Sequence, residues 1–161
     1  GGAVLTTMCI HHPTLFDGIV LVAPMIGIAE ETMPPGFVLW FFEHILAPLL
    51  PTAQMAPNED LSVLSWSDAE QRRLVLESPL GLNGEKLRLM TAFQLITATK
   101  WLGGKLAELK TPFLVLHATN DQVTQSQFSQ KLHTQAAAED KTIKLYPDAM
   151  HAELLHGGPS K

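Results

Sequence analysis

Three short runs rich in apolar residues occur along the chain, and each is too short for a helix. They span residues 18–23 (GIVLVA), 113–117 (FLVLH) and 142–146 (TIKLY). The first two are continuously apolar, which is typical of strands buried on both faces of a parallel sheet, whereas the third alternates as expected near a sheet edge. The pattern therefore predicts three strands.

Stretches with helical spacing separate these strands. A helix of small and apolar residues is expected over 1–12, an amphipathic helix over 101–110 that Thr111-Pro112 ends, and a further helix over 125–138. The order is then helix, strand, insertion, helix, strand, helix, strand. Strands that alternate with helices need right-handed crossovers, so the predicted fold class is α/β with a mainly parallel sheet.

An insertion over about residues 25–100 breaks this alternation and holds most of the prolines. Within it, residues 37–50 (FVLWFFEHILAPLL) are apolar nearly all the way round, yet the segment is too short to span a bilayer. It is either a helix buried beneath a cap or a lid helix that offers apolar surface to lipid or to an acyl substrate. Residues 84–99 are expected to form an amphipathic helix with three apolar residues on one face, Leu89, Phe93 and Ile96.

The composition fits a packed domain and excludes several classes of function. Apolar residues make up 46% of the 161 residues and charged residues 17%, which excludes disordered and collagen-like chains. With 11 Lys and Arg against 16 Asp and Glu, the chain has no general basic face, so no nucleic-acid partner is expected. Cys9 is expected to be a buried helix residue, and the adjacent imidazoles of His11 and His12 point apart. Neither a metal nor a cofactor is expected.

Two polar residues follow neighbouring predicted strands, where catalytic groups gather in open α/β sheets. Asp121 follows the strand at 113–117, and His151 follows the strand at 142–146. Alone, a loop aspartate is usually a turn residue and a lone histidine a packed or solvated one. Together they allow a carboxylate to accept the Nδ1–H of an imidazole and to stabilise the imidazolium. Their joint placement, with Asp before His, favours the acid and the base of a serine-hydrolase triad.

Several longer stretches resemble one known family. TPFLVLHATNDQVT and KTIKLYPDAMH, with the opening GGAV and the later HHPTLFDGIVLVAPM, resemble the monoacylglycerol lipase and lysophospholipase branch of the α/β-hydrolases, of the serine aminopeptidase S33 type. The resemblance extends through SPLG (78–81) and TAFQL (91–95) in the insertion. It implies that residues 1–161 are the C-terminal portion of one α/β-hydrolase domain, incomplete at its N-terminus, with a helical cap or lid at about 25–100.

In this family the nucleophilic serine lies in a G-x-S-x-G elbow that exposes its Oγ. Gly1 and Gly2 resemble the last glycines of the common form G-H-S-M-G-G, so the serine is expected two positions before Gly1; the chain itself contains no G-x-S-x-G. The resemblance makes Asp121 the triad acid and His151 the general base of an ester hydrolase that works through an acyl-enzyme. The 161 residues alone are expected to be inactive.

The resemblance also suggests where a substrate binds. Val123 and Ala152 flank the two triad residues and Leu95 lies on a cap helix, so all three are candidates for an acyl pocket, or else for simple core packing. The expected substrate is a monoacylglycerol or a related lysolipid. We expect a cytoplasmic location, with peripheral membrane contact through the cap as a further expectation.

Two other functions stay open. A non-catalytic protein of the α/β-hydrolase fold that binds lipids or partners would have lost the serine, so the residue two positions before Gly1 distinguishes it. A hydrolase of other esters or of peptides fits the same triad equally well. Only the apolar segment 37–50 favours a lipid substrate over these.

Overall fold

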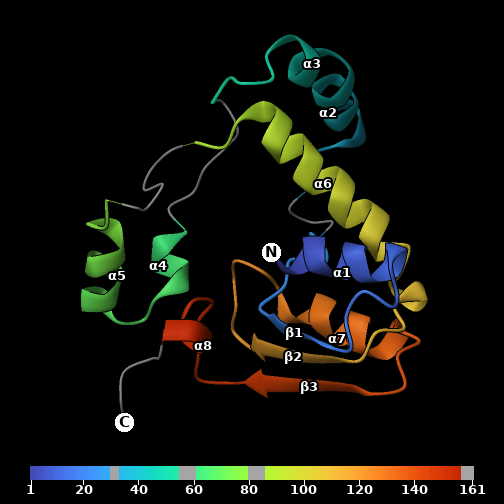
Figure 1. The fold of residues 1–161 in the computed structure, drawn as a ribbon. Helices are drawn as coiled ribbons and strands as arrows, with labels where there is room; N and C mark the ends of the chain where they lie inside the picture. Colours follow the sequence, from blue (N-terminus) through green and yellow to red (C-terminus); the bar gives the residue numbers. More distant parts are fainter. Residues whose placement is uncertain (30–32, 55–60, 80–85, 157–161) are drawn as a thin grey trace.

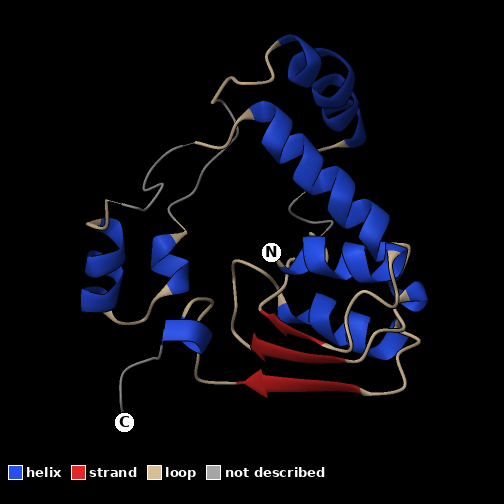
Figure 2. Ribbon diagram, in the orientation of Figure 1, coloured by secondary structure: helices blue, strands red, loops and turns tan. Residues whose placement is uncertain are grey.

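The computed structural model of the chain describes residues 1–29, 33–54, 61–79 and 86–156. It contains a three-stranded sheet (Figures 1 and 2), in which β1 (Ile19–Val22), β2 (Phe113–Ala118) and β3 (Lys141–Tyr146) lie in that order. Both pairs are parallel, with Phe113 opposite Ile19 on one side and Lys141 on the other. The three predicted strands and the parallel sheet are therefore confirmed.

Three helices next to the strands pack on one face of the sheet. α1 (Gly2–His11) precedes β1, α6 (Leu89–Gly103) leads towards β2, and α7 (Ser126–Gln135) joins β2 to β3. A short helix, α8 (Glu153–His156), follows β3 and lies beyond the carboxyl end of that strand (Figure 1). Because the strands are added in one direction and parallel crossovers are right-handed, the crossover helices return over the same face. α7 ends before the predicted residue 138, because the chain becomes extended at Ala136 and buries both Ala136 and Ala138 in the core.

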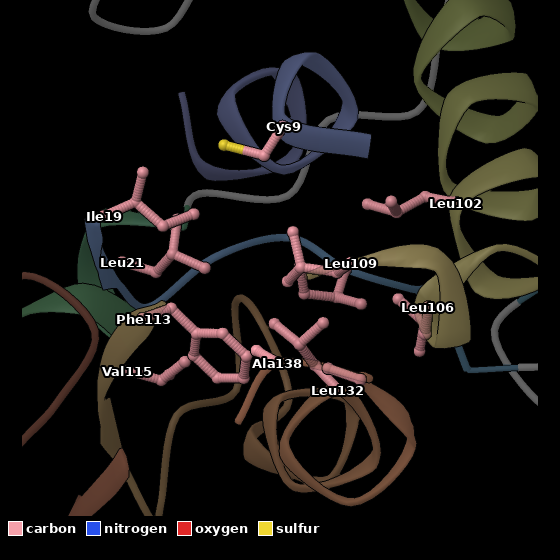
Figure 3. Packing of buried hydrophobic residues seen from close by; sticks show 12 residues of the cluster. Cys9, Ile19, Leu21, Leu102, Leu106, Leu109, Phe113, Val115, Leu132 and Ala138 are labelled. Carbon is pink, nitrogen blue, oxygen red and sulfur yellow. The ribbon is translucent and has the colours of Figure 1, made fainter. Parts of the chain in front are cut away.

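The hydrophobic core fills the space between these helices and the sheet (Figure 3). It brings together Leu21 of β1, Val115 of β2, Leu102 of α6 and Leu132 of α7, each almost completely buried. Cys9 of α1 lies in the same cluster, and burial raises the pKa of its thiol. The expectation that Cys9 is a buried helix residue is confirmed.

Truncation of this core is expected to be costly. Leu102 is 0% exposed, so Leu102→Ala should lower the free energy of unfolding by about 2–5 kcal/mol through lost burial and the cavity left behind. Urea denaturation of the full-length protein measures this loss. Leu74→Ala, at a position that is 52% exposed in another helix, is the matched control, with an expected change within about 0.5 kcal/mol. Equal losses in the two variants would contradict the assignment of the core.

The other face of the sheet is largely open in the part of the chain that the structure describes. On β1, Ile19 and Leu21 are buried but Val20 is 59% exposed, and Leu114 and Leu116 of β2 are only half-buried. The prediction that these strands are buried on both faces is therefore wrong for the described residues. The reason is that the packed helices lie on one side, so alternate strand residues face away from them.

The helix before β2 also differs from its prediction. The helices expected over 84–99 and 101–110 are replaced by one α-helix, α6, that continues to Gly103. The Gly103-Gly104 pair favours termination there, because glycine is a poor helix former, and only a short 3₁₀ turn, η3 (Leu106–Glu108), follows before β2. Two of the expected features lie partly outside the described residues. These are the SPLG stretch, at residues 80 and 81, and the helix expected over 84–99, at residues 84 and 85.

Between β1 and α6, the described residues form short helices and no strand. These are α2 (Gly36–Phe41), a π-helical turn η2 (Phe42–Leu46), α3 (Ala47–Leu49), α4 (Ser62–Ser65) and α5 (Ala69–Leu76). The first three form a continuous helical segment that packs against α6, where the ring centroids of Phe42 and Phe93 are 6.4 Å apart (Figure 1). Phe93 and Ile96 thus face this segment, as the predicted apolar face of α6 requires.

The helical segment 36–49 exposes most of its large apolar side chains. Phe37 is 76% exposed, Trp40 57% and Leu49 73%, whereas Ala47 is buried. A helix buried beneath a cap would hide these side chains. Among the described residues, this segment is therefore not the buried helix of the first expectation, and its role as a lid that offers apolar surface stays a prediction.

Candidate active site

The loops that follow β2 and β3 bring Asp121 and His151 together at the carboxyl edge of the sheet. Nδ1 of His151 lies 2.7 Å from Oδ2 of Asp121. Because an ionised carboxylate only accepts hydrogen bonds, Nδ1 carries the proton and Nε2 keeps a lone pair that can accept another. The His151 side chain is 27% exposed and that of Asp121 is fully buried. The geometry suits an acid and base pair, and the catalytic roles of the two residues stay predictions.

The residues after Asp121 hold its carboxylate in place. Oδ1 accepts hydrogen bonds of 2.8 Å from the amides of both Val123 and Thr124. Burial disfavours the charged form, but hydrogen bonds from His117, His151 and the Thr124 amide outweigh burial, so the pKa of Asp121 lies well below its ordinary value of 3.8. At neutral pH the carboxylate is therefore ionised and oriented towards His151.

The hydroxyl group of Thr124 lies at the centre of the site. Its Oγ1 is 3.1 Å from Oδ2 of Asp121, 3.2 Å from Nδ1 of His151 and 3.2 Å from the carbonyl oxygen of Ala23. Ala23 has a φ of 42°, which is uncommon outside glycine, and it turns the chain directly after β1. The sequence did not single out Thr124, because a threonine soon after a loop aspartate is equally an ordinary turn residue.

A second histidine, His117, lies next to the carboxylate of Asp121. His117, fully buried in β2, places Nε2 2.6 Å from the carbonyl oxygen of Thr124 and 3.3 Å from Oδ2 of Asp121. Both partners are acceptors, so Nε2 carries the proton and Nδ1 accepts from the hydroxyl group of Ser129 in α7, at 2.7 Å. His117 therefore links α7 to the loop after β2 that carries Asp121 and Thr124, here called the acid loop. From the sequence, His117 is expected only as the end of a strand, although a polar residue in a buried run is a signal that could have pointed to it.

The N-terminal end of α1 lies at the same edge of the sheet, near the arrowheads of the strands (Figure 1). A Cβ atom at Gly2 would lie 2.5 Å from Cβ of Pro24, so this position requires glycine. Pro24 directly follows Ala23, whose carbonyl contacts Thr124. Gly2 and the acid loop therefore meet the same turn after β1.

The structure places the three predicted substrate residues in two regions. Val123 and Ala152 flank the Asp121–His151 pair, and both are half-buried. Leu95 is half-buried in α6, and none of the hydrogen bonds described above involves that helix. A role in an acyl pocket stays a prediction for all three.

A cavity of about 510 Å³ lies between the loop after β1, the end of α6 and α7. Its lining includes Ile26, Lys100 and Phe128, but neither Asp121 nor His151. A substrate pocket must open onto the reacting atoms. We therefore do not assign this cavity to the substrate.

The parts of the chain that the structure describes contain no group of three or more His, Cys, Asp or Glu side chains that could hold a metal ion. None of their helices has the length and apolar character needed to cross a bilayer.

A parallel sheet with helices packed against it, and a carboxylate paired with an imidazole at its carboxyl edge, are features of the class of α/β-hydrolase folds. The family of serine aminopeptidases, S33, matches residues 1–156. The chain is therefore a member of this family, and the resemblance found in the sequence is confirmed.

Relatives of known name agree with this assignment. The chain is 30% identical to human monoglyceride lipase over 156 residues, which are 97% of this chain and 49% of that protein. It is 27% identical to caffeoylshikimate esterase of Arabidopsis thaliana over an alignment of 162 positions, which covers 100% of this chain and 48% of that protein. The chain thus spans about half the length of these relatives.

Solved structures share the fold. The monoacylglycerol lipase of Paleococcus ferrophilus superposes with a TM-score of 0.78 at 21% identity, covering 94% of this chain and 56% of that chain. A monoglyceride lipase variant of Saccharomyces cerevisiae gives a TM-score of 0.75 at 19% identity, with coverage of 94% and 52%. The predicted α/β-hydrolase fold is confirmed.

Proposed function

We propose that the protein is a serine ester hydrolase in which His151 is the general base and Asp121 orients it. The observation that carries this proposal is the 2.7 Å contact between Nδ1 of His151 and Oδ2 of Asp121 at the carboxyl edge of the sheet. The ionised Asp121 holds the ring in the tautomer whose Nε2 can take a proton. Family membership and the names of the relatives support a hydrolase.

The nucleophile in this proposal is a serine two positions before Gly1, at the turn that leads into α1. The packing of Gly2 on Pro24 supports such an elbow, because a glycine in this position lets a helix approach a strand closely. Serine Oγ attacks the ester carbonyl while Nε2 of His151 takes the hydroxyl proton and then passes it to the leaving alcohol. Water, activated by the same nitrogen, then releases the acid from the acyl-enzyme.

The substrate in this proposal is a monoacylglycerol or a related lysolipid. Exposed apolar side chains on segment 36–49 support it, because such surfaces favour acyl chains and the interfacial region of membranes. The 30% identity with a monoglyceride lipase supports it too. In this proposal the helices between β1 and β2 act as a cap that touches the membrane peripherally.

A second substrate class has an observation in its favour. The similarity to a caffeoylshikimate esterase, which covers the whole chain, supports an ester with an aromatic acyl group as the alternative. Both classes need the same Asp121–His151 pair, so the pair does not decide between them.

A fluorophosphonate probe tests the proposal in the full-length protein, which includes the segment before Gly1. We expect covalent labelling of the serine two positions before Gly1, no labelling when that serine is replaced by alanine, and faster hydrolysis of a long-chain monoacylglycerol than of a caffeoyl ester. Absence of labelling in the folded protein would exclude a serine hydrolase and favour a non-catalytic lipid-binding protein. The opposite substrate preference would leave the mechanism intact and reject the lipid assignment.

A further inference from the structure

Glu153 is a buried, charged residue close to His151 that the mechanism above does not use. It is 5% exposed, and its Oε2 accepts a hydrogen bond of 2.8 Å from the amide of Met150. In the other direction, the amide of Glu153 donates to the carbonyl of Met150 at 3.2 Å. These two bonds close the turn that carries His151, as a glutamate does in a helix capping box.

The second carboxylate oxygen of Glu153 binds the insertion between β1 and β2. Oε1 accepts hydrogen bonds from the amide of Ser67, at 2.8 Å, and from the hydroxyl group of the same residue. Beside it, the amide of Ala152 donates to the carbonyl of Ser65 at 3.1 Å. Figure 1 shows the result, with α8 lying next to α4 at the arrowhead end of β3.

The charge of Glu153 matters for these contacts. Burial disfavours the ionised form, but hydrogen bonds from Ser67 and Met150 outweigh burial, and the pKa of Glu153 is lowered. Both oxygens of an ionised carboxylate can accept, so the group satisfies two backbone amides and one hydroxyl group at once.

We propose that Glu153 is a positioning residue for His151, which fixes the turn of the general base against residues 65–67 of the insertion. The His151 ring is partly exposed, and Asp121 and Thr124 contact it at one nitrogen only. The direction in which Nε2 points therefore also depends on the backbone conformation of the turn that carries His151. Through Glu153, the position of the insertion and the position of the base become coupled. This inference rests on the proposed function, because it assigns a role within the same site.

The variant that isolates the contact is Glu153→Gln. Glutamine has nearly the same shape, but its amide group has one acceptor oxygen, and its NH₂ cannot accept. In either orientation of the amide, the backbone N–H of Met150 or of Ser67 loses its acceptor. We expect kcat per active site to fall about 10- to 100-fold, because small misplacements of a catalytic group cost this much, with KM changed by less than about twofold.

Active sites are counted by fluorophosphonate titration of the full-length protein, which separates misfolding from mispositioning. A merely structural role would lower the number of titrated sites and leave kcat per site unchanged, which would overturn the inference. Glu139→Gln, at an exposed loop position, is the matched control and should keep the wild-type kcat. If Glu153→Gln does not fold, Ser67→Ala, which removes only the hydroxyl contact, should lower kcat per site about 3- to 10-fold.

The outcomes also separate this inference from the proposed function. If the wild-type protein does not react with the probe, the proposed function fails. If the wild-type protein reacts and neither variant changes kcat per site, the function stands and the positioning role of Glu153 is rejected.

Discussion

If the proposed function holds, replacement of His151 by alanine in the full-length protein is expected to lower kcat by roughly 10⁴- to 10⁶-fold, as loss of the general base does in serine hydrolases. Without the imidazole, no group accepts the serine proton, and the leaving alcohol departs without a proton donor. Stability should change little, because the side chain is partly exposed and makes its polar contacts with Asp121 and Thr124 through one nitrogen.

Steady-state hydrolysis of a soluble ester, with the amount of folded protein verified by denaturation, measures this loss. His12→Ala is the matched control, because that side chain is exposed at the C-terminal end of α1, and its activity should stay within about twofold of the wild type. A His151→Ala variant that is folded and keeps more than about a tenth of the wild-type kcat would show that another group is the base.

Asp121→Asn is expected to lower kcat by about 10⁴-fold without removing the imidazole. If the side-chain oxygen keeps the amides of Val123 and Thr124, the NH₂ group takes the place of Oδ2 and points at His151. A donor there favours the tautomer that carries its proton on Nε2, and that nitrogen can then no longer accept the serine proton. The same NH₂ group would face Nε2–H of His117, which adds a repulsive contact.

The pH dependence of stability gives a second measurement for Asp121. Its pKa is lower in the folded protein than its ordinary value of 3.8, so the unfolded chain binds the proton more readily. The stability that this carboxylate contributes is therefore complete above about pH 5 and is lost as the pH falls below about 4. Urea denaturation at about pH 5 and about pH 3 should show a smaller loss for Asp121→Asn than for the wild type. Equal losses would mean that the folded carboxyl group is not held in its charged form.

Much of the fold could be predicted from local patterns. The strands were found because continuous apolar runs of this length fit a sheet better than a helix, and their parallel order follows from the helices between them. The end of α6 was placed wrongly, because the apolar spacing continues past Gly103-Gly104 and a local pattern does not show where the helix must turn towards β2. The open face of Val20 was missed for a related reason, since an apolar run does not say which face neighbouring elements cover.

The residues of the site also include some that could be predicted from the sequence and some that could not. Asp121 and His151 could be predicted because each stands just after a strand, and parallel strands end at one edge. Thr124 and Glu153 could not, because their residue types and positions are also those of ordinary turn and helix residues, and His117 offered only the signal of a polar residue in a buried run. Their partners lie elsewhere in the chain, such as Ala23 for Thr124 and Ser67 for Glu153.

The sequence by itself determined the order of helices and strands and the two residues that follow β2 and β3, since these depend on local periodicity and on position along the chain. Its motifs carried the resemblance to the family. Only the tertiary structure decided which face of the sheet is covered, how the carboxylate of Asp121 is kept charged, and which carboxylate ties the turn of His151 to the insertion. Hydrogen bonds between residues far apart in sequence form only where packing brings donor and acceptor to within about 3 Å, and no local pattern records that distance.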